Sequence, residues 1–299
     1  DGVPAVLGGI DVFGTGIDTL AENEIPFVGG IPVSAQAVEN ANSFQWSGGT
    51  WGATVAFAHH AATEVKADSV AIVYPEFGPI SDSADYGRIT LENAGVTDVV
   101  MVPYPITATD LSSPIQAANS ASPDAVIMLA ADTGCKGAFD GFATVGVEAQ
   151  VYLVGACASP KIIDEAGPDK TEGTIFNVEG SLARGVANVD FSLYQAVAAE
   201  YGDGFDPIGA GTVTFRSFMN LYRVLAALDD DVTPAGITAS LQAQDEAPSF
   251  MGHPSTCDGE QLAGLPALCS PQQILAELKD GELVQVGDWI DVGEVFGDG

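Results

Sequence analysis

The chain has 299 residues with 9 basic and 41 acidic side chains, which gives a formal net charge of −32. Because 46% of the residues are hydrophobic and only 17% are charged, the composition can fill one large core or two ordinary ones, and it excludes intrinsic disorder. The scarcity of Lys and Arg excludes nucleic acid as a partner and disfavours anionic membranes, and the longest apolar runs are too short to span a bilayer.

Short apolar runs alternate with amphipathic segments over the first 178 residues. In chain order the pattern predicts strand 4–10, helix 14–24, strand 25–29, helix 50–65, strand 69–74, helix 83–94, strand 98–102, helix 110–121, strand 125–130, helix 134–145, and strands 151–154 and 173–178. Since the strands are uniformly hydrophobic and alternate with helices, we expect an α/β fold whose parallel sheet is covered on both faces.

The pattern changes after residue 178. Long helices are predicted at 189–201, 213–228 and 234–242, and Asp280–Gly281 lies between two alternating segments, which indicates a hairpin. At the other end, DGVPAVLGG runs directly into the first strand without a preceding helix or signal peptide. We therefore expect this chain to be a fragment or a processed product of a longer one.

Four cysteines suggest two disulfides and an oxidising compartment. Cys257 and Cys269 bound a loop rich in Pro and Gly, which a disulfide would stabilise by reducing its entropy in the unfolded chain. Cys135 and Cys157 each follow a predicted strand, where neighbouring parallel strands would bring them together. A metal site is the disfavoured alternative, because there is no CxxC, no HxxxH and no cluster of His residues with ligand spacing.

Several segments in order resemble one known family. The stretch DGVPAVLGGIDVFGTGIDTLAENEIPFVGGIPVSAQ is similar to the first lobe of type I periplasmic binding proteins. The later series SVAIVYPEFG, PDAVIMLAADTGCKGAFDGFATVGV, VYLVGACASP and GTIFNVEG is similar to the second lobe. The tail resembles the branched-chain amino acid subfamily of ABC-transporter solute-binding proteins, and the resemblance covers essentially the whole chain. It also implies further N-terminal residues that are absent here.

This resemblance implies two Rossmann-like lobes with parallel sheets flanked by helices, joined by three crossovers, with the ligand held in the cleft between them. The first lobe would comprise residues 1–46 and 181–250, and the second would comprise residues 48–178 and 251–299. We expect the crossovers near 46–49, 178–180 and 250–253. In such folds ligands bind where loops leave the carboxyl ends of the strands.

The loops at those strand ends supply the candidate ligand-binding residues, which depart from the pattern of amino-acid binders. Relatives place Ser or Thr in the first two loops and a Glu in the second lobe, near Cys157 here. An acidic side chain at Asp11, Asp132 or Glu179 could supply the negative charge, or could simply cap a helix. The candidates are Asp11, Val12, Phe13, Gly30, Ile31, Pro32, Trp46, Phe77, Ala131, Asp132, Thr133, Cys157 and Glu179.

Among these candidates, Phe13, Trp46 and Phe77 could form an apolar clamp, with hinge packing as the alternative. Gly30 would let the backbone approach a ligand closely, or would serve a plain tight turn. The departures make a standard branched-chain amino acid a less good fit than a small, partly apolar solute that is cationic or an amide.

The sequence favours a binding protein over an enzyme. It has no GxSxG, no GxxxxGK[ST] and no complete GxGxxG after a strand, and we expect no cofactor and no metal. The resemblance implies an extracytoplasmic solute-binding protein, periplasmic or extracellular, whose absent N-terminus could carry a lipid anchor, and whose partners are a small solute and ABC-transporter permease subunits. The alternatives are a ligand-sensing domain of a receptor or regulator and, least favoured, an α/β enzyme. The acidity fits a hydrated surface in a salty or extracytoplasmic setting better than it fits a cationic ligand.

Overall fold

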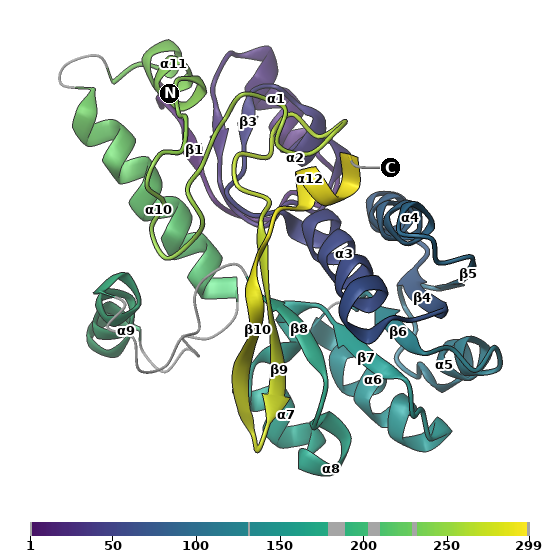
Figure 1. Cartoon of the computed structure of the whole chain (residues 1–299). Coiled ribbons are helices and arrows are strands. Elements are labelled where there is room, and N and C mark those ends of the chain that lie inside the picture. Colours follow the sequence, from purple (N-terminus) through teal and green to yellow (C-terminus); the bar gives the residue numbers. More distant parts are fainter. Residues whose placement is uncertain (1, 131, 179–188, 203–209, 229–231, 298–299) are drawn as a thin grey trace. The chain divides into compact units, whose positions relative to one another are not determined.

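The computed structural model describes residues 2–130, 132–178, 189–202, 210–228, 232–297. The side chains of residues 132, 133, 210 and 211 are not described. The described residues divide into two units: unit 1 takes those of 1–49, 179–272 and 291–297, and unit 2 takes those of 50–178 and 273–290. Each unit is built around its own sheet (Figure 1).

Among the described residues, unit 2 contains a seven-stranded sheet in the order β10-β9-β8-β7-β6-β4-β5. The five strands from β8 to β5 are parallel, as their apolar sequences predict, and β9 and β10 extend the sheet as an antiparallel hairpin that turns at Asp280 and Gly281. The bounds are β4 (Ser69–Pro75), β5 (Asp98–Tyr104), β6 (Ala125–Met128), β7 (Gln150–Leu153), β8 (Ile175–Val178), β9 (Gln273–Lys279) and β10 (Glu282–Ile290).

Helices flank the parallel strands of unit 2, as the alternating pattern predicts. The most buried of them is α3, in which Trp51 and Phe57 are at most 2% exposed. Its continuation is a π-helical turn, η1, rather than the α-helix that we expected. The elements are α3 (Gly49–His60), η1 (Ala61–Val65), α4 (Gly78–Asn93), α5 (Ser112–Asn119), α6 (Asp132–Val145), η2 (Gly155–Ala158), α7 (Pro160–Ala166) and α8 (Pro168–Thr171).

Unit 1 contains a small parallel sheet in the order β1-β2-β3, with two residues in each strand. Its core joins these strands to α10 and α11 through Val28, Phe44, Leu221 and Ile237, which are all buried. The bounds are β1 (Val6–Leu7), α1 (Thr15–Glu22), β2 (Phe27–Val28), α2 (Ala35–Glu39), β3 (Ser43–Phe44), α9 (Val189–Tyr201), α10 (Ala210–Ala227), α11 (Pro234–Gln242) and α12 (Val292–Gly297).

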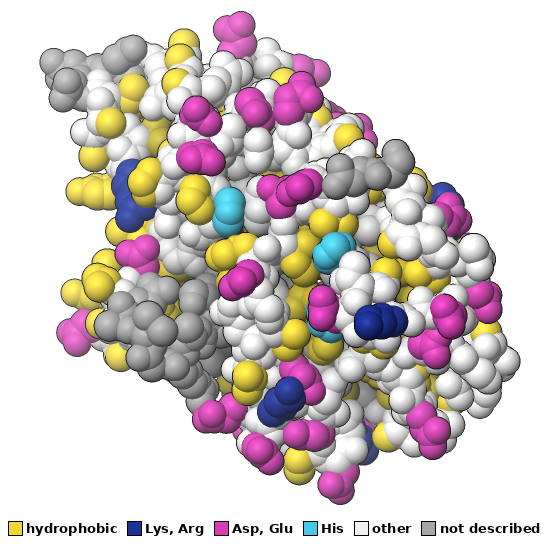
Figure 2. All heavy atoms as spheres, viewed as in Figure 1, with side chains coloured by type: hydrophobic (Ala, Val, Ile, Leu, Met, Phe, Trp, Pro, Cys, Tyr) yellow, Lys and Arg dark blue, Asp and Glu magenta, His cyan; other side chains and the backbone are white. Residues whose placement is uncertain are grey.

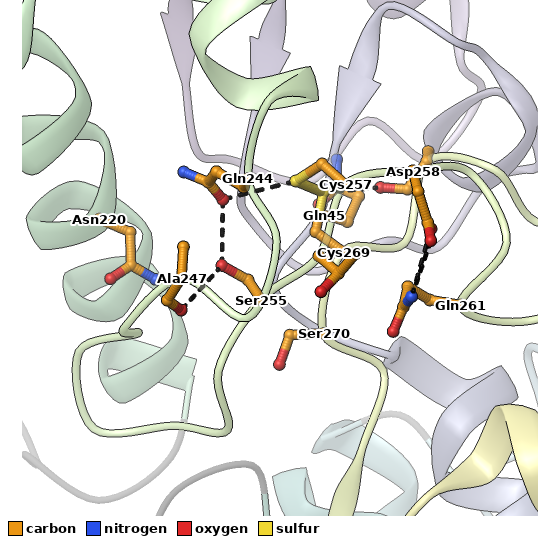
Figure 3. The surroundings of a disulfide bond; sticks show 12 residues. Gln45, Asn220, Gln244, Ala247, Ser255, Cys257, Asp258, Gln261, Cys269 and Ser270 are labelled. Atoms are coloured by element: carbon orange, nitrogen blue, oxygen red, sulfur yellow. Dashed lines mark hydrogen bonds between the residues drawn. A yellow bond between two sulfur atoms is a disulfide. The ribbon is translucent and has the colours of Figure 1, made fainter.

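The structure differs from the expected division in the C-terminal part. We expected residues 251–299 in the second lobe, but 251–272 and 291–297 belong to unit 1, so the chain enters unit 2 again at Gln273. The physical reason is that segment 267–269 pairs with the chain after β3: Gln45 donates its backbone N–H to Ala267 and accepts one from Cys269, both at 2.8 Å. The disulfide between Cys257 and Cys269 holds the two ends of this loop together (Figure 3).

Candidate ligand-binding site

Glycines form the two loops that follow β1 and β2 in unit 1. Gly29 and Gly30 have φ angles of 70° and 98°, in the region that favours glycine. A Cβ atom at Gly29 would collide with the side chain of Ser217, and one at Gly30 would collide with the carbonyl oxygen of Gly9. The Gly30 N–H also donates to the Ser217 hydroxyl at 3.3 Å. The glycines therefore let the two loops and α10 approach one another closely, and a contact of Gly30 with a ligand stays a prediction.

Asp11 caps the helix that follows it. One of its carboxylate oxygens accepts the N–H of Gly14 and the other accepts the N–H of Ile17, both at 2.9 Å. These are donors at the start of α1 that have no partner within the helix. The geometry supports the cap interpretation of this acidic residue, because both oxygens already accept a hydrogen bond.

The rest of this loop exposes apolar side chains. Ile10, Val12 and Phe13 are 57%, 40% and 76% exposed, which is unusual for three large apolar residues within four positions. In the second loop, Ile31 is half-buried and Pro32 is buried. Unit 1 therefore presents three exposed apolar side chains at the carboxyl end of β1, beside a carboxylate that caps α1.

Trp46 lies in the hydrophobic core of unit 1. Its side chain is 1% exposed and belongs to the buried cluster that includes Val28, Phe44 and Cys269. Its indole nitrogen has no hydrogen-bond partner among the described residues. The indole thus packs in the core of unit 1, and the clamp that we expected it to form with Phe13 and Phe77 stays a prediction.

In unit 2, the strand-end loops are only partly described. Phe77 is half-buried and precedes α4, where its carbonyl oxygen accepts the N–H groups of Ile80 and Ser81 at 2.9 and 3.0 Å. Ala131 and Glu179 lie outside the described residues. Asp132 begins α6, but its side chain and that of Thr133 are not described. The structure therefore leaves their proposed contacts as predictions.

Cys157, one of the candidate ligand-binding residues, forms a disulfide bond with Cys135. Both side chains are fully buried, and the bond joins the first turn of α6 to η2. Each residue follows one of two neighbouring parallel strands, as the sequence predicts. Because its sulfur is engaged in this bond, Cys157 offers no side-chain donor or acceptor of its own to a ligand.

Two polar residues at the carboxyl ends of strands in the unit 2 sheet were not among the sequence candidates. Asn177, in β8, accepts the N–H of Gly155 through Oδ1 at 2.7 Å and donates to Gln273 Oε1 at 3.0 Å. Tyr104, at the end of β5, donates its hydroxyl to the carbonyl of Leu129 at 2.7 Å, and burial raises the pKa of Tyr104 to about 12. Tyr104 is therefore a neutral hydrogen-bond donor at physiological pH.

Metal chemistry and membrane insertion find no support in the described part of the chain. No group of three or more His, Cys, Asp or Glu residues there could hold a metal ion. No helix in those residues has both the length and the apolar character needed to cross a membrane. The loop after β1 in unit 1 exposes apolar side chains. At the strand ends of unit 2, the side chains of Asn177 and Tyr104 instead form hydrogen bonds with the backbone of Gly155 and Leu129.

One family, described as "Periplasmic binding protein", matches residues 1–262. A comparison with proteins of curated function found no match. The match includes residues of both units: 1–49 and 179–262 of unit 1, and 50–178 of unit 2.

Solved structures share the fold. A leucine binding protein from Thermotoga maritima has a TM-score of 0.72 at 14% identity, over 94% of this chain and 79% of that one. A branched chain amino acid ABC transporter structure from Thermus thermophilus with bound valine has a TM-score of 0.76 at 15% identity, covering 98% and 80%. A solute binding protein from R. palustris in complex with 4-hydroxybenzoate has a TM-score of 0.73 at 17% identity, covering 96% and 78%.

Proposed function

This chain belongs to the periplasmic binding protein family, and from that premise we propose that it is the extracytoplasmic solute-binding protein of an ABC importer. The family consists of binding proteins, so the chain is a binding protein and not an enzyme. Similar structures that are described as ABC transporter proteins, one holding valine and one holding 4-hydroxybenzoate, support the transport role.

The solute that we propose is small and largely apolar, either amino-acid-like or amide-like. The observation that carries this proposal is the loop after β1, where Ile10, Val12 and Phe13 are exposed while the carboxylate of Asp11 caps α1. Covering apolar surface contributes roughly 25 cal/mol per Å², so a solute that buries these side chains gains affinity without a charge from this loop.

Capture would follow the mode that the resemblance implies, with the solute held between the lobes and hinge bending closing them over it. Permease subunits of the importer would then receive the solute. A periplasmic or extracellular location is supported by the two disulfides, because such bonds persist in oxidising compartments.

Calorimetry with four solutes that share one isobutyl group tests the solute class. L-Leucine, L-leucinamide, 4-methylpentanoate and 4-methylpentanamide differ only in whether an ammonium group, a carboxylate or an amide is present. We expect at least one of them to bind with a Kd of about 1 μM or tighter, a free energy near −8 kcal/mol. Absence of binding by all four, and by 4-hydroxybenzoate as an aromatic probe, would contradict the proposal.

Two matched substitutions test the loop itself. We expect Phe13→Ser to raise the Kd of the tightest-binding of these solutes by about tenfold, because the substitution removes the most exposed apolar side chain of the loop. Val3→Ser is the control, since Val3 is 46% exposed but precedes β1. Equal losses of affinity in the two variants would show that the loop after β1 has no special role.

A further inference from the structure

The two disulfides lie in different surroundings. Cys257–Cys269 closes a loop within unit 1, and both residues belong to the buried cluster around Trp46. Cys135–Cys157 instead joins two segments that leave the carboxyl ends of β6 and β7, which are neighbours in parallel register. The sequence separations are 12 and 22 residues, so the loops that the two bonds close are comparable in size.

The disulfide fixes η2 on the side of β6. Cys157 is the third residue of η2, and Cys135 lies in the first turn of α6, with 5.2 Å between their Cα atoms. The helix is itself anchored on the sheet, because Phe139 packs against Phe176 with 6.5 Å between ring centroids. The covalent bond therefore ties η2 to a helix that packs against the sheet.

Asn177 fixes the same segment on the side of β8. The main-chain pairing of β7 with β8 ends at Leu153 and Phe176, and the side chain of Asn177 continues it by accepting the Gly155 N–H. Asn177 is in turn held by Gln273, a fully buried residue that begins β9. A Cβ atom at Gly155 would collide with the carbonyl oxygen of Asn177, so the contact also requires a glycine.

Between these two attachments, η2 presents Ala156 at the surface of unit 2. The two residues that follow it, the disulfide-bonded Cys157 and Ala158, are buried. Backbone N–H and C=O groups at such a strand end can contact a solute only if they keep one geometry, and a segment that is ordered beforehand pays less entropy on binding.

We propose that the Cys135–Cys157 disulfide and Asn177 together hold η2 in the conformation that receives the solute, so that solute affinity depends on this brace and not on the Cys257–Cys269 disulfide. Asn177 is a positioning residue in this scheme. The inference rests on the proposed function. It adds that the backbone of η2, which the disulfide orders, is the part of unit 2 that contacts the solute.

The test uses the C257S/C269S variant of the full chain, which retains Cys135–Cys157 as its one possible disulfide because the sequence has four cysteines. A dithiol reductant converts that disulfide to two thiols, giving up two electrons and two protons and becoming a cyclic disulfide itself. The same protein can then be measured oxidised, reduced and reoxidised. Two further variants remove the two attachments of η2 separately: C135S/C157S removes the disulfide, and Asn177→Ala in the wild-type chain removes the hydrogen bond to Gly155.

Amide hydrogen exchange gives the readout that needs no solute. We expect reduction and Asn177→Ala each to speed exchange at 155–159 by about tenfold or more, with reoxidation restoring protection in the reduced sample. In C257S/C269S, exchange should rise at 265–269 and remain unchanged at 155–159. Unchanged exchange at 155–159 after loss of both the disulfide and the Asn177 amide would overturn the brace.

Calorimetry gives the second readout, with L-leucine as the probe, or 4-methylpentanamide if leucine does not bind. We expect the Kd to rise about tenfold in C135S/C157S and in Asn177→Ala, which corresponds to about 1.4 kcal/mol, and to stay within about twofold in oxidised C257S/C269S. Faster exchange at 155–159 with an unchanged Kd would overturn the positioning role. If neither probe nor any other tested solute binds the wild type, the proposed function fails, and so does the claim that the disulfide and Asn177 raise solute affinity. Hydrogen exchange at 155–159 still tests whether the disulfide and Asn177 order η2.

Discussion

Asp11 closes the first turn of α1 with two hydrogen bonds, and this local role competes with any role in binding. The Gly14 and Ile17 N–H groups occupy one oxygen each. A carboxylate at a helix start is also favoured by the helix dipole, so the loop gains stability from the charge without any ligand. The neighbouring apolar side chains of Ile10, Val12 and Phe13 are exposed and add little to the stability of the fold. We therefore assign Asp11 a structural role and keep the apolar residues of this loop as the candidates for binding.

Substitution of Asp11 should therefore change stability and leave binding largely intact. We expect Asp11→Ala to lower the free energy of unfolding in urea by about 1 kcal/mol, because two N–H groups lose their cap. Asp18→Asn is the matched control: it removes a charge from the same first turn, and we expect a change below about 0.5 kcal/mol. If Asp11→Asn abolished binding of L-leucine while sparing 4-methylpentanamide, Asp11 would be an ammonium ligand instead.

Some residue roles could be predicted from the sequence and others could not. Both cysteine pairs were predictable, because each cysteine has a recognisable place: at the ends of a loop, or just after neighbouring strands. The cap at Asp11 is a short-range contact with a known pattern. Asn177 has no local signal, since its partners Gly155 and Gln273 are 22 and 96 residues away. Such a contact exists only after β7, β8 and β9 have been placed side by side.

The long helix predicted at 50–65 is two elements, and their junction carries a buried polar pair. The α-helix α3 ends at His60 and the π-helix η1 follows it. His60 Nδ1 lies 2.8 Å from the Tyr152 hydroxyl, and their rings meet edge to face at 5.7 Å. Desolvation by burial lowers the pKa of His60, partly opposed by the carboxylate of Glu64, and burial raises the pKa of Tyr152.

This pair makes the stability of the wild type sensitive to mild acid. Because the pKa of His60 is lower in the folded state than in the unfolded state, its contribution is fully present above the ordinary value of about 6.5 and is lost as the pH falls below it. We expect His60→Leu to cost about 1 to 3 kcal/mol at pH 7.5 by leaving the Tyr152 hydroxyl buried without its partner. The cost, measured by urea unfolding, should shrink toward pH 5.

A double substitution provides the control for this pair. In Tyr152→Phe the hydroxyl is absent, so adding His60→Leu should cost clearly less than it does in the wild type. If the two costs were equal, or if the cost of His60→Leu grew as the pH fell, the hydrogen bond between these residues would not be the source of the effect.

Helix and strand predictions succeeded where the local signals were strong. The helices 189–201 and 234–242 have the predicted bounds, and the second begins with Pro234 after the capping residue Thr233. The five-residue helix α2 and the two-residue strand β3 were not predicted, because neither is long enough to show a hydrophobic period. β3 exists through its pairing with β2, which is a tertiary contact.

The division of the chain into units was harder to predict than its elements. The resemblance implied that the chain crosses between the lobes near residues 46–49 and 178–180. In the structure the chain passes from unit 1 to unit 2 after Gly49 and leaves unit 2 after Val178. The expected exchange at 250–253 is instead at Gln272, because the disulfide-closed loop joins unit 1 through Gln45 and Leu268. A loop without periodicity gives no sequence signal for the sheet that it will join.

The excess of acidic residues is a property of the whole molecule, and it should make stability depend on salt. The net charge is −32, and Figure 2 shows Asp and Glu side chains spread over the face in view. The ion pairs between described side chains include Arg88 with Asp85 and Glu92, and Lys170 with Asp140, all partly exposed and therefore weak. Repulsion among the remaining acidic side chains then outweighs attraction.

Screening should therefore stabilise this protein, in contrast to one held by surface ion pairs. The Debye length falls from about 30 Å at 0.01 M salt to about 8 Å at 0.15 M, so most repulsion between separate acidic residues is removed over this range. We expect the Tm at pH 7.5 to rise by about 3 °C or more between these two NaCl concentrations. KCl at equal ionic strength should give the same shift, which distinguishes screening from specific ion binding. A Tm that is constant or falls over this range would mean that the acidic side chains are compensated within the fold.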